Sequence, residues 1–225
     1  MQLFSRLLQA SVRAGAQRLA AAARLARLSP NVITLVGLGL TVVAAVLIAL
    51  DMLLPAGVVL LLAGSMDILD GAVARVSGRT QRYGAFLDST ADRYGEGAIY
   101  LGLLYLLLIR EHQDLDVFLV AAALLGSLLV SYVRARAQSL GFTCDDGWFA
   151  RPERVVVTVL GLVLGQLTIM LWILAIATNL TAIQRIYVVW TQHRAQMTSE
   201  AASAETTEAS SQLPPANPRR GAAPS

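Results

Sequence analysis

Four aspartates form two closely spaced pairs whose spacing suits metal chemistry. Asp67 and Asp70 are three residues apart and Asp88 and Asp92 are four apart, so the members of each pair share one face of a helix. Apolar runs lead into the first pair and out of the second. At membrane depth four uncompensated carboxylates would cost roughly 10–14 kcal/mol, at roughly 2.5–3.5 kcal/mol each. Hard divalent cations such as Mg²⁺ offset that cost, because they bind carboxylate oxygens and keep coordination positions open for a phosphate.

Small residues and one arginine lie beside these carboxylates. Gly71, Ala74 and Gly84 would let a ligand approach the backbone closely, and Arg75 can hold a phosphate through two parallel hydrogen bonds. The link over about residues 76–83 is short enough to make the two helices antiparallel neighbours, so that all four carboxylates converge. Helix caps or a solvated face are the alternative role for the aspartates, which their apolar flanks disfavour.

This stretch resembles the signature of the CDP-alcohol phosphatidyltransferases, D-x2-D-G-x2-A-R-x8-G-x3-D-x3-D. The resemblance implies an integral membrane bundle of six helices, a homodimer, and a reaction between a CDP-linked lipid such as CDP-diacylglycerol (CDP-DAG) and an alcohol. The products would be a phosphodiester lipid and CMP. All eight fixed positions are matched at the family's spacing, namely Asp67, Asp70, Gly71, Ala74, Arg75, Gly84, Asp88 and Asp92.

The resemblance also implies roles for these residues. Asp67, Asp70 and Asp88 would bind two Mg²⁺ (or Mn²⁺) ions. Asp92 would serve as a ligand, as the general base that takes the proton of the acceptor hydroxyl, or as both. Two polar residues at the start of the first span join the expected CDP-lipid site, with helix capping as their alternative role. That site comprises Asn31, Thr34, Gly71, Ala74, Arg75 and Gly84.

The composition indicates one membrane domain. Of 225 residues, 56% are hydrophobic, which is too apolar for a soluble globule, and several runs approach the roughly 20 residues that span a bilayer. The net charge is +3 and every cation is an arginine. No basic stripe is interleaved with aromatic residues, so nucleic-acid binding is not expected. Cys144 is the single cysteine, which excludes an internal disulfide, and His112 and His193 are too far apart in sequence to suggest zinc.

We expect three regions along the chain. Residues 1–29 carry five arginines and no acid, which predicts an amphipathic helix on the membrane surface, with an organellar transit peptide as the alternative. Residues 30–194 form the all-α domain of six spans, which begins at Pro30 and turns near Gly165 between the last two spans. Residues 195–225 are rich in Ala, Ser, Thr, Glu and Pro and predict a disordered tail.

Charge asymmetry predicts the orientation. Six spans put both termini and the carboxylates on one side, and most arginines lie there, whereas the opposite loops carry Arg110 and four acids. The positive-inside rule then places the site and termini on the cytoplasmic side. We expect the membrane to be that of a prokaryotic cell. Gly161 and Gly165 form a small-residue pair that suits either a dimer contact or packing inside the bundle.

Arginines at the cytoplasmic helix ends are candidates for binding the acceptor. Such arginines are often membrane anchors, but several together would also suit a phosphate group. Segments 131–137 and 151–154 resemble those of the phosphatidylinositol-phosphate synthases, which carry Lys where this chain has Arg134. The resemblance favours inositol phosphate as acceptor, with glycerol 3-phosphate and phosphatidylglycerophosphate synthesis as the alternative. The candidate acceptor-phosphate residues are Arg134, Arg136, Arg154 and Arg185.

Two other functions compete with transfer. A cation transporter or channel could also carry an intramembrane aspartate cluster, but it has no use for Gly71, Arg75 and Gly84 at fixed spacing. An inactive scaffold would not need to keep all four aspartates. Both alternatives are therefore less consistent with the sequence than a transferase.

Overall fold

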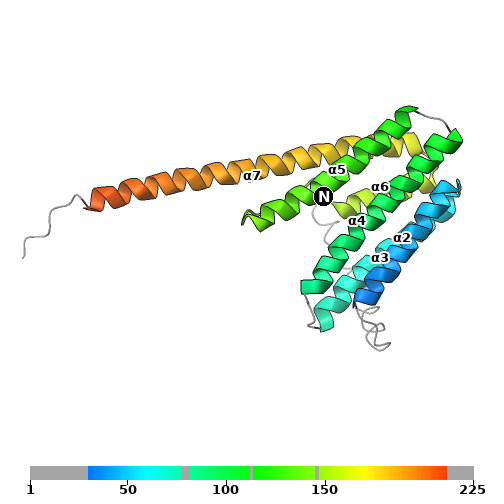
Figure 1. Ribbon diagram of the computed structural model, residues 1–225, viewed down its shortest axis with the longest axis horizontal. Coiled ribbons are helices and arrows are strands. Elements are labelled where there is room, and N and C mark those ends of the chain that lie inside the picture. Colours follow the sequence, from blue (N-terminus) through cyan, green and yellow to red (C-terminus); the bar gives the residue numbers. More distant parts are fainter. Residues whose placement is uncertain (1–29, 78–81, 112–113, 145–146, 212–225) are drawn as a thin grey trace, which may run out of the picture.

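The computed structural model describes residues 30–77, 82–111, 114–144 and 147–211, and every regular element in these ranges is helical. This confirms the predicted all-α class, while the expected amphipathic helix over residues 1–29 lies outside the described residues. The elements in chain order are α2 (Pro30–Ala49), α3 (Leu53–Ser77), α4 (Arg82–Tyr105), a π-helical turn η1 (Leu106–Glu111), α5 (Asp114–Ser139), α6 (Arg151–Val163) and α7 (Leu167–Ser211). Figure 1 labels the six α-helices of the described ranges.

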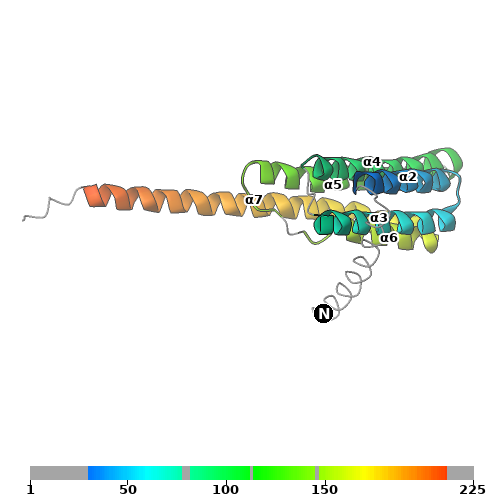
Figure 2. The same cartoon turned by 90° about the horizontal axis from the view of Figure 1, so that it is seen from below.

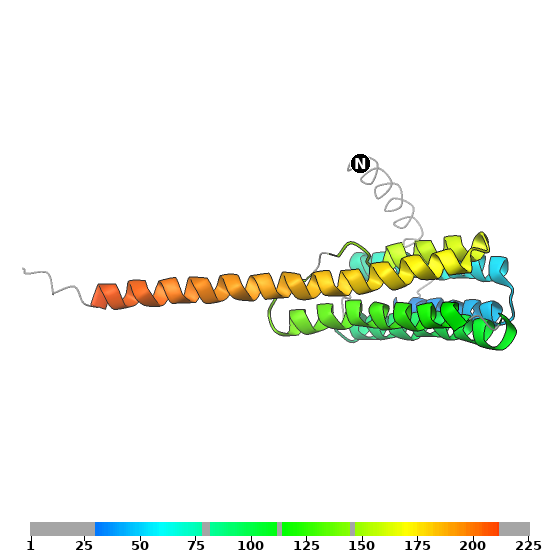
Figure 3. The ribbon, with the colours of Figure 1, turned by 90° about the horizontal axis from the view of Figure 1, so that it is seen from above.

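The helices form two layers, which Figures 2 and 3 show from opposite sides. Helices α2, α4 and α5 make one layer, and α3, α6 and α7 make the other. Across the layers α2 packs on α3 and α5 packs on α7. Within each layer the middle helix, α4 or α6, contacts both of its neighbours. Helices α4 and α6 therefore face each other at the centre of the bundle.

Helices α3 and α4 are not packed directly on each other along their length, as the short link between them had suggested. They run antiparallel (Figure 1), but they belong to different layers and share no extensive backbone contact within the described residues. Helix α2 packs against both of them instead. Its sequence is apolar on nearly every side, so it can bury two faces at once.

The outer surface is that of a multi-pass membrane protein. Within the described residues, three helices are long and apolar enough to cross a bilayer, Asn31–Ala49, Asp114–Ser139 and Leu167–Glu200, and Leu53–Met66 is a shorter apolar helix. Large apolar side chains are exposed along them, among others Val42, Leu61, Leu125, Ile176 and Ile183. In water such surfaces would promote aggregation, whereas lipid tails accommodate them. The full count of six spans stays a prediction.

A dry core holds the layers together at the end of the bundle away from the α3–α4 link. Ile48, Leu103, Leu107, Leu171 and Leu174 are completely buried there. They come from α2, α4 with its π-helical turn, and α7. This core fixes the spacing of the helices whose other ends carry the acidic and basic residues.

The predicted turn between the last two helices is confirmed, and it changes the interpretation of the glycine pair. Gly165 lies in this turn with φ +64°, outside the helices, a conformation that glycine adopts at little cost. Gly161 is buried in α6, where an added Cβ would lie 2.5 Å from the Cβ of Met170 on α7. The two glycines therefore share no helix face, and Gly161 serves packing within the bundle.

The predicted disordered tail is wrong for residues 195–211, which continue α7 as far as Ser211. Residues 212–225 lie outside the described residues. Alanine and glutamate in this stretch are good helix formers. Extending a helix that packing has already nucleated is also far easier than starting a new one. Composition alone therefore misjudged a segment that begins at the end of a packed helix.

Candidate active site

The two carboxylate pairs lie on α3 and α4 near the link that joins these helices. Asp67 and Asp70 belong to α3, whose backbone is described there although their side chains are not. Asp88 and Asp92 lie one helical turn apart on α4 and are both partly buried. Paired carboxylates shielded from water suit a hard divalent ion. Among the described side chains no three potential ligands gather, so the predicted metal site depends on the α3 aspartates and stays a prediction.

Two ion pairs connect α4 to α6 at the centre of the bundle. Arg151 Nη1 lies 2.7 Å from Asp92 Oδ1, and Arg154 Nε donates to Glu96 Oε1 at 2.7 Å. The acids are four residues apart on α4 and the arginines three apart on α6, so each helix presents one face to the other. We call these two contacts the α4–α6 ladder. It crosses between helices that have no extensive backbone contact with each other within the described residues.

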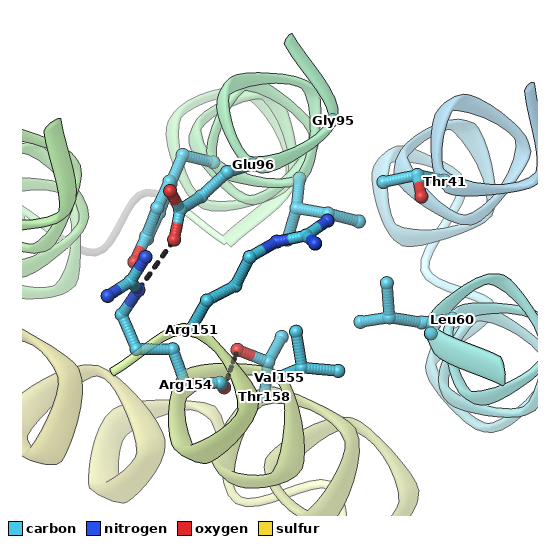
Figure 4. A pocket seen from close by; sticks show the side chains of 11 residues that line it. Thr41, Leu60, Gly95, Glu96, Arg151, Arg154, Val155 and Thr158 are labelled. Atoms are coloured by element: carbon cyan, nitrogen blue, oxygen red, sulfur yellow. Dashed lines mark hydrogen bonds and ion pairs between the residues drawn. The ribbon is translucent and has the colours of Figure 1, made fainter. Parts of the chain in front are cut away.

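A pocket opens beside the ladder, enclosed by α2, α3, α4 and α6 (Figure 4). In this view Arg151 reaches from α6 toward α4 and α2, while Arg154 lies against Glu96. Thr158 donates to the backbone oxygen of Arg154 at 2.8 Å, which supports the first turns of α6. The lining residues are Thr41, Leu60, Gly64, Gly95, Glu96, Ile99, Tyr100, Arg151, Arg154, Val155 and Thr158.

Helical periodicity relates this pocket to the aspartates. On α4, Asp88, Asp92 and Glu96 follow at four-residue intervals, so one face carries all three from the helix start to the pocket. On α3, Asp67 follows the pocket-lining Gly64 by three residues. Both carboxylate pairs therefore lie along helix faces that lead from the pocket toward the α3–α4 link.

The predicted CDP-lipid residues gather at the same end of the bundle. A Cβ on Gly84 would lie 3.3 Å from Oδ1 of Asn31, so the start of α4 sits against the start of α2. Thr34 is buried one turn further along α2. The remaining members lie in the last turns of α3, where side chains are not described, and they are Gly71, Ala74 and Arg75.

The four arginines predicted to bind the acceptor fall into two groups. Arg154 and Arg185 are both 3% exposed, and Arg185 Nη1 donates to the carbonyl oxygen of Val130 on α5 at 2.6 Å. Arg134 and Arg136 are exposed on α5, and Arg136 Nη1 contacts Ser139 Oγ on its own helix at 3.5 Å. Only Arg154 lines the pocket. A single pocket formed by all four arginines therefore stays a prediction.

Sequence reasoning missed the site roles of Arg151 and Glu96, although both left a signal. Glu96 continues the four-residue spacing of Asp88 and Asp92. Arg151 and Arg154 occupy the first turn of α6, where the helix dipole disfavours positive charge. The unfavourable interaction of these arginines with the helix dipole is offset by their ion pairs with the acids of α4.

The chain is similar to proteins of a known family over most of its length. The family profile described as CDP-alcohol phosphatidyltransferase matches residues 27–197. A phosphatidylinositol phosphate synthase of Mycobacterium tuberculosis is 33% identical over 174 residues, covering 73% of this chain and 80% of that protein. One of Corynebacterium glutamicum is 39% identical over 170 residues, covering 71% of this chain and 77% of the other.

Solved structures show the same likeness. The crystal structure of the M. tuberculosis phosphatidylinositol phosphate synthase with CDP-DAG bound has a TM-score of 0.73 at 32% identity, covering 78% of this chain and 94% of that one. The structure of that enzyme with manganese and citrate has a TM-score of 0.74 at 32% identity, covering 78% and 89%. The matched signature, the fold and these likenesses together show that the chain is an enzyme of the CDP-alcohol phosphatidyltransferase family.

Proposed function

We propose that the protein transfers the phosphatidyl group of CDP-DAG to inositol phosphate and releases CMP. An acceptor hydroxyl oxygen would form the new bond to the phosphatidyl phosphorus, and the bond from that phosphorus to the CMP oxygen would break. The observation that carries this proposal is the position of Arg154. Its guanidinium is buried in the pocket and pairs with Glu96, one helical turn along α4 from Asp92. It offers a phosphate site close to the predicted reaction centre.

The aspartates divide the chemical work in this proposal. Asp67, Asp70, Asp88 and Asp92 would hold two Mg²⁺ (or Mn²⁺) ions, which when bound would neutralise charge on the pyrophosphate. Asp92 would also take the proton of the acceptor hydroxyl as that oxygen approaches phosphorus. Its partly buried position on α4, one helical turn from the pocket-lining Glu96, supports this role.

The two substrates would meet at this end of the bundle. The nucleotide would lie along the starts of α2 and α4 and the end of α3, against Asn31, Thr34, Gly71, Ala74, Arg75 and Gly84. The acceptor phosphate would lie against Arg154, with Arg185 and the exposed Arg134 and Arg136 on its α5 and α7 side. The curated relatives named phosphatidylinositol phosphate synthase support this choice of acceptor. Membership of a transferase family leaves nothing in favour of a cation transporter or channel.

The proposal also covers the membrane topology, the cellular location and the oligomeric state of the enzyme. We infer six spans, with the site and both termini in the cytoplasm of a prokaryotic cell, where nucleotide-activated lipids are met. A homodimer is expected from the family resemblance. The multi-pass helical surface and the bacterial relatives support this setting.

The test is release of CMP by the full chain in lipid nanodiscs with CDP-DAG and Mg²⁺. Inositol phosphate, glycerol 3-phosphate, serine and free inositol are supplied in turn. We expect release with inositol phosphate, loss of release on chelation, and recovery with added Mg²⁺ or Mn²⁺. Release with glycerol 3-phosphate alone would make the protein a phosphatidylglycerophosphate synthase, and release with none would refute the proposal.

Asp92→Asn is the matched variant for the base assignment. Removal of a general base slows a reaction by about 10²–10⁴-fold, and we expect a loss of turnover in this range while CDP-DAG still binds. The amide keeps the size of the side chain, so the fold should persist. Turnover at the wild-type rate in Asp92→Asn would eliminate Asp92 as the base.

A further inference from the structure

The inner contact of the ladder holds Arg154 from two sides. Its Nε donates to Glu96 Oε1 at 2.7 Å, and its Nη1 donates to the carbonyl oxygen of Phe149 at 3.4 Å. The side chain of Arg154 is 4% exposed and that of Glu96 is 13% exposed. Contacts from α4 and from the segment before α6 thus fix the plane of the guanidinium. These two contacts engage Nε and Nη1, whereas an arginine fork has five N–H donors, so donors at the tip remain for a ligand oxygen.

The Glu96–Arg154 pair is poorly suited to a purely stabilising role. Buried ion pairs often contribute no more than apolar residues of the same size, because both charges lose their water. Glu96 Oε2 is buried and has no hydrogen-bond partner in the described part of the chain, which adds a further cost. Arg154 also stands in the first turn of α6, at the unfavourable end of the helix dipole. These three unfavourable contributions to stability indicate that the Glu96–Arg154 pair has a role other than stabilising the fold.

The geometry points to such a benefit: we propose that Glu96 is a positioning residue, which aims the Arg154 guanidinium at the phosphate of the acceptor. This inference rests on the proposed function, because it takes Arg154 to bind that phosphate. Glu96 accepts from Nε, on the side of the fork, and so leaves the tip donors directed away from itself. Glu96 does not contact the reacting atoms. It acts only by keeping Arg154 in one orientation within a pocket that α4 and α6 enclose.

The test measures KM separately for acceptor and for CDP-DAG in the full chain in nanodiscs. Glu96→Met keeps the length of the side chain but removes the acceptor oxygen, whereas Glu96→Gln keeps an oxygen that can accept from Nε. Loss of a side chain that orients a metal-binding residue typically costs about 10–100-fold, and we take the same range for a side chain that orients a phosphate-binding arginine. We expect the acceptor KM of Glu96→Met to rise in this range, with kcat and the KM for CDP-DAG near wild type. Glu96→Gln should rescue most of the loss.

Glu153→Gln is the matched control, because it removes the same charge from an exposed side chain next to Arg154 in sequence. It should leave both KM values unchanged. An unchanged or lower acceptor KM in Glu96→Met would overturn the inference, as would an equal rise in both KM values. If Glu96→Met does not fold, Glu96→Gln provides the test. Its KM for the acceptor must then rise measurably but by less than tenfold, and its KM for CDP-DAG must stay constant.

The order of measurements separates this inference from the proposed function. Wild-type enzyme is first tested with the acceptor series, and the variants are then measured with whichever phosphorylated acceptor releases CMP. Release with glycerol 3-phosphate instead of inositol phosphate refutes the proposed acceptor and leaves the role of Glu96 to its own test. Release only with acceptors that carry no phosphate would refute the role of Glu96 as well.

Discussion

Replacing Arg151 should change how tightly the enzyme binds a divalent ion. Arg151 Nη1 and Asp92 Oδ1 are 2.7 Å apart, with Arg151 32% and Asp92 13% exposed. If Asp92 Oδ1 is a metal ligand, this oxygen must exchange the guanidinium for the ion. A hydrogen bond to a charged group is worth about 1.5–3 kcal/mol, which corresponds to about 10–150-fold in a binding constant. Because Arg151 is about one-third exposed, solvent screening places the expected effect near the lower end.

We therefore expect Arg151→Gln to bind Mn²⁺ about tenfold more tightly than wild type. The measurement is a titration of the full chain in nanodiscs, with free Mn²⁺ followed by electron paramagnetic resonance. This readout does not depend on turnover. Arg151→Lys keeps a positive charge and should stay closer to wild type.

Arg93→Gln is the matched control for charge, since Arg93 Nη1 lies 3.4 Å from Asp92 Oδ2 and makes a weaker contact. Its effect on Mn²⁺ affinity should be the smaller of the two. Equal affinity in wild type and Arg151→Gln would mean that Asp92 Oδ1 is not a metal ligand. Weaker binding in the variant would mean that Arg151 supports the metal site and does not compete with the ion for Asp92.

Two further predictions concern stability. Thr168 Oγ1 donates to the buried Asp116 Oδ2 at 2.6 Å, so Thr168→Val should cost about 1.5–3 kcal/mol and lower the thermal midpoint by roughly 3–12 °C. Thr198→Val, on an exposed part of α7, is its control and should leave the midpoint unchanged; equal midpoints in the two variants would refute the role of Asp116. Gly161→Val would push a side chain into the buried Met170 and should cost about 1–3 kcal/mol. A denaturation midpoint like that of wild type would show that the α6–α7 contact can relax.

The sequence predicted the elements that depend on local chemistry. The start at Pro30 and the turn at Gly165 both follow from backbone preferences that a single residue carries, and both are found. Each carboxylate pair also lies on a single helix, α3 or α4, as its spacing indicated, although the pairs lie inside these helices and not at their ends. These features need no knowledge of how distant helices pack.

Features that depend on packing between distant helices were not predictable in the same way. Glu96 and Arg154 are 58 residues apart, and nothing local joins α4 to α6. The position of α2 against both α3 and α4 likewise depends on its all-round apolar surface, which permits several arrangements. The helical state of residues 195–211 depends on the packed part of α7 before it. In each case the structure of a segment depends on contacts with residues that lie outside that segment, and the sequence of the segment alone does not reveal them.

Helix α7 is long enough to separate whatever follows it from the bilayer. Its 45 residues extend about 68 Å at 1.5 Å per residue, against about 30 Å of hydrocarbon. The figures show its far part projecting beyond the other helices (Figure 1), and residues 193–200 are exposed there. A fluorescent reporter attached after Ser211 would thus stand on the order of 35–40 Å from the hydrocarbon. It could report the side of the membrane on which α7 emerges without covering the pocket.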